Sequence, residues 1–142
     1  MSVLIPPPLH PGDTIAILPT ARAITAGELQ AGIALAESWG LQVRLGAGIG
    51  RKHFQQAGTD AERAADLQAA LADDDVKAIW CARGGYGTVR IMEQVDLNVL
   101  LKRPKWIVGF SDGAVLHSAL HKLGVSSLHA QIASGRSDVE AS

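Results

Sequence analysis

The chain has 142 residues, 47% of them hydrophobic, and its 13 Lys and Arg nearly balance its 14 Asp and Glu. This length predicts one domain with an ordinary packed core. The balanced charge, with no basic stripe, argues against nucleic acid as a partner. A single cysteine, Cys81, excludes a disulfide within the chain and fits a reducing compartment.

No apolar run approaches the ~20 residues of a membrane-spanning helix, so no membrane partner is expected. The first eight residues, Met1–Pro8, lack a basic stretch and carry only a short apolar patch followed by prolines. They do not have the pattern of a secretory signal peptide. We therefore expect a protein that works in the cytoplasm.

In chain order, short apolar runs alternate with segments of helical periodicity. The runs predict five strands, over residues 14–18, 41–45, 76–81, 105–109 and 125–129. Helices are expected between them, over about residues 25–40, 59–72, 88–95, 97–102 and 112–123. The first two helical segments begin with capping boxes, Thr25 with Glu28 and Thr59 with Glu62.

Strands that alternate with helices imply right-handed crossovers and a parallel sheet covered on both faces. The predicted fold class is α/β, a three-layer, doubly wound, mainly parallel sheet of the flavodoxin-like kind. In such sheets ligands bind at the carboxyl ends of the strands. Three candidate functional segments directly follow predicted strands: Pro19–Thr20, Arg83–Gly87 and Phe110–Gly113.

The segment 109–113 matches the pattern Gly-x-Ser-x-Gly at a predicted strand-to-helix junction, with Ser111 at its centre. In such a tight turn the small flanking residues let the serine protrude, as nucleophiles of hydrolases do. The free N–H groups of the following helix would stabilise developing negative charge beside it. The alternative is an ordinary helix cap, because Ser111 and Asp112 both favour that position.

The segment Arg83-Gly84-Gly85-Tyr86-Gly87 places three glycines after a buried strand. Glycine permits close backbone approach, and adjacent N–H groups here would cradle an oxyanion or a phosphate. The segment lacks the Gly-Lys-Ser/Thr ending of a phosphate-binding loop and the spacing of a dinucleotide fingerprint. The alternative is a flexible turn without a ligand.

Three histidines are candidates for a functional role. His117 and His121 stand at i, i+4 on one predicted helix, a spacing that can bind a metal, but the Glu of a His-Glu-x-x-His motif is missing. We interpret them as part of a solvated helix face, and no metal site is expected. His129 ends a predicted strand on the same side of the sheet as Ser111, so spacing alone makes it a candidate base. The alternative is a strand-end histidine held by backbone hydrogen bonds.

Three motifs together, Pro11-Gly12-Asp13, Arg83–Gly87 and Gly109-Phe110-Ser111-Asp112, resemble the LD-carboxypeptidases in order and spacing. That family includes muramoyl-tetrapeptide carboxypeptidases and microcin C7 immunity proteins. The resemblance spans residues 11–129 and implies a sheet like that of class I glutamine amidotransferases. It implies a cytoplasmic serine peptidase that removes a terminal D-alanine from murein tetrapeptides in cell-wall recycling.

The resemblance also implies roles for individual residues. The nucleophile of the family falls on Ser111, and the backbone N–H groups of its oxyanion hole fall on Asp112 and Gly85. Arg83, Gly84 and Tyr86 fall in the substrate-binding segment. The expected partner is a small peptide, with no cofactor and no metal, and the full-length protein is expected to form a homodimer.

Two departures from the family stand out. After Ser111-Asp112 the family often has a bulky residue and then Thr, whereas this chain has Gly113-Ala114. Family members are also about twice as long, with a catalytic Glu and His in a C-terminal domain that these 142 residues lack. Residues 1–133 are therefore expected to form the nucleophile domain, and residues 134–142 a linker or the end of an expressed fragment. This chain alone is expected to be inactive, and His129 does not match the base of the family.

Three other functions stay open at this point. The first is a flavodoxin-like module that binds an anion at Arg83–Gly87 without chemistry. The second is a self-contained esterase with His129 as base. The third is part of a hydrolase that acts on microcin-like peptide–nucleotides. Only an activated serine should react with a fluorophosphonate probe, which separates the hydrolases from the binding module.

Overall fold

The structure is a computed structural model that describes residues 5–20, 23–52, 56–82, 88–109, 114–126 and 128–129. Five strands form one sheet: β1 (Thr14–Leu18), β2 (Gln42–Leu45), β3 (Val76–Cys81), β4 (Trp106–Gly109) and β5 (Leu128–His129). All neighbouring strands are parallel, in the order β2-β1-β3-β4-β5. This is the flavodoxin-like strand order, and it confirms the predicted fold class.

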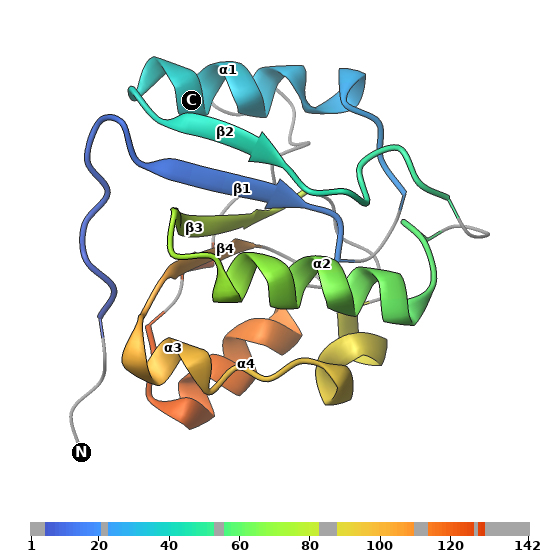
Figure 1. The fold of residues 1–142 in the computed structure, drawn as a ribbon, viewed down its shortest axis with the longest axis vertical. Helices are drawn as coiled ribbons and strands as arrows, with labels where there is room; N and C mark the ends of the chain where they lie inside the picture. Colours follow the sequence, from blue (N-terminus) through green and yellow to red (C-terminus); the bar gives the residue numbers. More distant parts are fainter. Residues whose placement is uncertain are drawn as a thin grey trace.

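Helical elements cover both faces of the sheet (Figure 1). They are the 3₁₀ segment η1 (Gly27–Leu29), α1 (Gln30–Ser38), α2 (Asp60–Ala72), the 3₁₀ segment η2 (Thr88–Gln94), α3 (Val99–Lys102) and α4 (Ala114–Leu123). One hydrophobic cluster joins the sheet to η1 and α1, and a second joins it to α2, η2, α3 and α4. The three predicted layers are therefore present.

The central strand β1 shows how the sheet separates the two clusters. Ile15 and Ile17 belong to the cluster on the α1 side, whereas Ala16 and Leu18 belong to the cluster on the α2 side. Successive side chains of a strand point to opposite faces, so a strand covered on both faces must be apolar throughout. All four residues are at most 3% exposed.

Both predicted capping boxes are present, but they open different elements. Thr59 and Glu62 exchange backbone-to-side-chain hydrogen bonds of 2.8 and 3.1 Å at the start of α2. Thr25 and Glu28 do the same at 3.2 and 3.4 Å, yet only the short η1 follows them. The backbone of Leu29 (φ −97°, ψ 2°) leaves α-helical angles, and α1 begins after it. Gly40, at φ +83°, ends this helical segment as expected.

Two other predicted boundaries differ from the structure. The strand expected over residues 125–129 is described as β5 at Leu128–His129, with an isolated β-bridge at Val125. The N–H of Val125 also donates to the carbonyl of Leu120 at 2.9 Å, so the same residue satisfies a carbonyl at the end of α4. The helix expected over residues 88–95 is the 3₁₀ segment η2. Among the described residues, no helix is long and apolar enough to cross a membrane.

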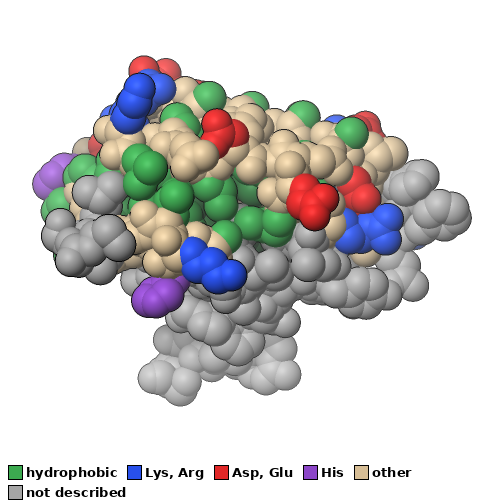
Figure 2. All heavy atoms as spheres, turned by 90° about the horizontal axis from the view of Figure 1, so that it is seen from below, with side chains coloured by type: hydrophobic (Ala, Val, Ile, Leu, Met, Phe, Trp, Pro, Cys, Tyr) green, Lys and Arg blue, Asp and Glu red, His purple; other side chains and the backbone are tan. Residues whose placement is uncertain are grey.

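The η2–α3 segment supplies the outer part of the second cluster. Met92, Val95, Leu97 and Val99 pack against it while only partly buried, and Leu101 is 43% exposed. Seen from below the view of Figure 1, hydrophobic side chains gather on this face with charged side chains at their margin (Figure 2).

The substitution Leu67→Ala is expected to destabilise the domain by about 2–5 kcal/mol, because it removes a fully buried side chain and leaves a cavity. Leu67 is 0% exposed on the inner face of α2. Leu101→Ala removes the same atoms from an exposed site and should change the unfolding free energy by less than about 1 kcal/mol. Urea unfolding of both variants measures the difference, and equal losses would contradict the placement of Leu67 in the core.

Candidate active site

The carboxyl ends of four neighbouring parallel strands lie at one edge of the sheet. Leu18 of β1 is in register with Cys81 of β3, and Gly109 of β4 is in register with His129 of β5. The chain turns to opposite sides of the sheet after β1 and β3, since α1, which follows β1, and η2, which follows β3, pack on different faces. This is a topological switch point, the place where ligands bind in open α/β sheets.

Six predicted site residues lie outside the described residues: Ser111, Asp112, Arg83, Gly84, Gly85 and Tyr86. The structure does describe the strand ends that lead into them. β3 and β4 are adjacent, with Trp80 in register with Val108, so the chain enters both segments from the same edge of the sheet. That Ser111 and Gly85 lie within a few ångströms of each other stays a prediction.

The predicted histidines differ in what the structure shows of them. His129 is in β5 and pairs with Gly109, two residues before Ser111 in the sequence. His121 lies on α4 with an exposed side chain, in agreement with a solvated face. No group of three metal-ligating side chains occurs in the described part of the chain.

Of the three predicted functional segments, the structure describes one, Pro19–Thr20. Thr20 follows β1 and is 1% exposed. Its carbonyl oxygen accepts a hydrogen bond of 2.9 Å from Nη1 of Arg63, a side chain of α2 that is also 1% exposed. The end of β1 is thus tied to the first turns of α2 by a buried guanidinium.

The same guanidinium belongs to a charge cluster that sequence reasoning missed. Nη2 of Arg63 pairs with Asp60, and Nε of Arg90 in η2 lies 3.0 and 3.3 Å from the two carboxylate oxygens of Asp60. One signal was present in the sequence, because Arg63 stands on the stripe of α2 that also carries Leu67 and Leu71. A cation on a core-facing stripe requires a buried acceptor.

The basic residues of the loop after β2 are partly neutralised within the fold. Arg51 pairs with Asp66 of α2 and lies 3.3 Å from Glu62. Burial raises the pKa of the Asp66 carboxyl, while the charge of Arg51 and its hydrogen bond oppose that shift. A Cβ at Gly48 would collide with the carboxylate of Asp66 and the guanidinium of Arg51, so a larger residue there would displace this ion pair.

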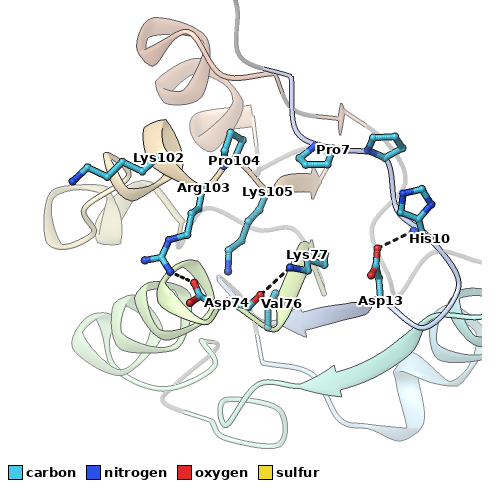
Figure 3. Close-up of a pocket in the computed structure, with 11 residues that line it drawn as sticks. Pro7, His10, Asp13, Asp74, Val76, Lys77, Lys102, Arg103, Pro104 and Lys105 are labelled. Atoms are coloured by element: carbon cyan, nitrogen blue, oxygen red, sulfur yellow. Dashed lines mark hydrogen bonds and ion pairs between the residues drawn. The ribbon is translucent and has the colours of Figure 1, made fainter.

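A pocket of about 490 Å³ opens at the other edge of the sheet, near the amino ends of β3 and β4 (Figure 3). Its basic side chains serve the fold: Arg103 pairs with Asp74, and Lys77 donates to the carbonyl of Asp74 at 3.1 Å. The ammonium of Lys105, 4% exposed, donates to the carbonyls of Ala70, at 2.8 Å, and of Asp73. Lys105 thus binds the last carbonyls of α2.

Comparison with known proteins decides the family. The profile of the LD-carboxypeptidase N-terminal domain matches residues 15–130. The chain belongs to the LD-carboxypeptidase family. The predicted resemblance is therefore confirmed, and the matched range includes the segments that follow β1, β3 and β4.

Curated relatives in the LD-carboxypeptidase family are considerably longer than this chain. It is 40% identical over 117 residues to a probable murein peptide carboxypeptidase of Bacillus subtilis, covering 82% of the chain and 37% of the relative. It is 34% identical over 122 residues to the murein tetrapeptide carboxypeptidase of Pseudomonas aeruginosa, covering 85% and 40%. It is 25% identical over 121 residues to the microcin C7 self-immunity protein MccF of Escherichia coli, covering 83% and 35%. The chain spans less than half the length of each.

Solved structures of the LD-carboxypeptidase type share the fold. The muramoyltetrapeptide carboxypeptidase of Oxalobacter formigenes superposes with a TM-score of 0.79 at 32% identity, over 88% of this chain and 43% of that one. MccF in complex with glutamyl sulfamoyl guanosine superposes with a TM-score of 0.77 at 22% identity, over 86% and 37%. The second likeness shows the fold alone.

The pKa of Lys105 gives a test of this fold at alkaline pH. Burial lowers that pKa from the ordinary 10.5 to about 8, the nearby charge of Asp73 opposing the shift. Between these pH values the unfolded chain holds the proton and the folded chain does not, so this group makes stability rise with pH. The unfolding free energy of the wild type relative to Lys105→Met should therefore grow, by up to about 3 kcal/mol, between pH 8 and 10.5.

Chemical denaturation across this pH range measures that difference. Lys102→Met is the matched control, because Lys102 lines the same pocket with an exposed side chain. A Lys105→Met difference that shrinks as the pH rises would contradict the buried position of the ammonium.

Proposed function

We propose that the protein is the nucleophile-bearing, N-terminal part of a serine peptidase that removes a terminal D-amino acid from murein tetrapeptides in the cytoplasm. One observation carries the proposal. The strand that ends two residues before Ser111 lies beside the strand that leads into the glycine-rich segment 83–87, and both approach the switch-point edge. Family membership and the murein-peptide names of the relatives support the same reaction.

In the proposed reaction, Oγ of Ser111 attacks the carbonyl carbon before the terminal D-residue while a base takes its proton. The N–H groups of Asp112 and Gly85 hold the oxyanion of the tetrahedral intermediate, and Arg83, Gly84 and Tyr86 bind the peptide. The base returns the proton to the leaving amine, which departs with the D-residue. Water then attacks the acyl-enzyme and frees Ser111.

The base belongs, in this proposal, to a His–Glu pair in the C-terminal part of a full-length protein. Residues 1–133 form the nucleophile domain, residues 134–142 lead out of it, and the full-length protein is a homodimer. The support for a second part is that the chain spans 37–45% of several carboxypeptidase relatives. The reaction uses protein groups and water, with no cofactor.

A second substrate class is favoured by one specific observation. MccF, which this chain resembles in fold and in part of its sequence, is solved with glutamyl sulfamoyl guanosine bound. A peptide–nucleotide conjugate contains an acyl bond that the same serine would attack. Hydrolysis of an L,D-tetrapeptide and of an aminoacyl nucleotide, assayed side by side, distinguishes the two substrates.

Ser111→Ala in the full-length protein should lower turnover by at least about 10³-fold and abolish labelling by a fluorophosphonate probe, because no other group replaces the nucleophile. Its thermal unfolding should match that of the wild type. Ser38→Ala is the control, since Ser38 is an exposed serine of α1 whose hydroxyl only donates to the carbonyl of Leu35. A wild-type rate in the Ser111→Ala protein would end the serine-peptidase proposal, and a folded wild type that is never labelled would favour a binding module.

The 142-residue chain by itself should not hydrolyse an L,D-tetrapeptide, because a serine hydroxyl needs a base within about 3 Å. The register between His129 and Gly109 makes one exception testable. Turnover that depends on Ser111 and disappears in a His129→Ala version would identify His129 as the base. It would support a self-contained esterase and contradict a base from a second domain.

A further inference from the structure

Arg63 occupies a position that helix energetics disfavours. It lies near the N-terminus of α2, where the partial positive charge of the helix repels a cation, and its side chain is 1% exposed. Burying a guanidinium is costly even when it is paired, and well-packed apolar residues often replace such pairs without loss of stability. Stability alone therefore does not explain why an arginine stands there.

The contacts of Arg63 join elements that the sequence separates widely. Nη1 donates to the carbonyl of Thr20 at the end of β1, and Nη2 pairs with Asp60 in the first turn of α2. Asp60 in turn holds Nε of Arg90 in η2, at 3.0 Å to one carboxylate oxygen. A planar guanidinium fixes the angle between two acceptors, which an ammonium cannot do.

These contacts lie at the switch-point edge of the sheet. Thr20 follows the last residue of β1 by two positions, and the N–H of Ala82, just after β3, donates to the carbonyl of Leu18 at 2.9 Å. η2 begins at Thr88, directly after residues 83–87 in the sequence. The ion pair of Asp60 with Arg90 therefore lies three residues after the end of that glycine-rich segment in the sequence.

We infer that Arg63 and Asp60 are positioning residues: they hold the end of β1 and the start of η2 in one fixed arrangement at the proposed active site. The inference rests on the proposed function. Their proposed role is indirect: Arg63 acts through the carbonyl of Thr20, and Asp60 through the side chain of Arg90. Their effect is on where the backbone donors after β3 stand relative to the nucleophile after β4, and an error of about 1 Å in such a position can cost about 10²-fold in rate.

A positioning role and a purely stabilising role make different predictions for the full-length protein. Arg63→Lys keeps the buried charge and one hydrogen bond but loses the fork, so it should stay folded while kcat falls at least about 10-fold and KM changes less than about 3-fold. The double variant Asp60→Asn/Arg63→Met removes both charges, avoids an unpaired buried ion and should also fold with a low kcat. Arg44→Met is the control, because it breaks an exposed pair with Asp73 at the other end of α2.

Hydrogen exchange provides a readout that does not depend on catalysis. In Arg63→Lys, amide exchange should accelerate in η2 and at the end of β1 but not in β3. Folded Arg63→Lys and double variants with wild-type kcat would overturn the inference, as would exchange that rises equally throughout the domain. Failure of the proposed function appears differently, as a wild-type protein in which the fluorophosphonate never labels Ser111.

Discussion

Parallel pairing of β1 with β3 is the contact from which the remaining architecture follows. These strands are adjacent in the sheet although β2 and α2 separate them in the sequence, so the chain must leave β1 toward one face and return to β3 from the other. That reversal places α1 and α2 on opposite faces and creates a topological switch point at the carboxyl ends of β1 and β3. It also buries most of both strands on both faces: residues 15–18 of β1 and 78–81 of β3 are buried, whereas Lys77 of β3 is exposed.

α2 is held to the sheet by a cation at each end. The helix dipole attracts the cation at one end and repels the cation at the other. Lys105 binds carbonyls at the C-terminus, where the helix dipole favours a positive charge. Arg63 stands near the N-terminus, where the dipole opposes it, and depends on Asp60 and the carbonyl of Thr20. Burial nevertheless disfavours the charge of Lys105 as well and lowers its pKa to about 8, so both cations carry an electrostatic cost. Of the two, Arg63 is the one that lies at the edge with the proposed chemistry.

Sequence reasoning succeeded where local chemistry determines the structure. β1 and β3 have the expected bounds, because each consists mainly of apolar residues that become buried, and both capping boxes form their reciprocal bonds. It failed where a distant partner decides. Val125, expected within a strand, forms only an isolated β-bridge, and its N–H donates to Leu120 at the end of α4. The role of Lys105 depends on carbonyls of α2 that no local pattern connects with it.

The candidate site divides along the same line. Ser111 and the glycine-rich segment carry local motifs, so a single sequence is enough to propose them as site residues, and both lie within the range that the family profile matches. Arg63 carries no motif. The sequence shows only that a cation stands on an otherwise apolar helical stripe. The acceptors that make this position possible, the carbonyl of Thr20 and the carboxylate of Asp60, are known only from the fold.

A motif-based reading therefore finds the groups proposed to react and misses those that hold them in place. The reacting groups must display a fixed local geometry to the substrate, whereas positioning groups need only reach their partners in the folded chain. Several kinds of side chain can serve as positioning groups, and they can lie at many different separations from their partners in the sequence. For this reason the structure adds most at the buried polar contacts around the site, where each donor must find an acceptor that the sequence does not name.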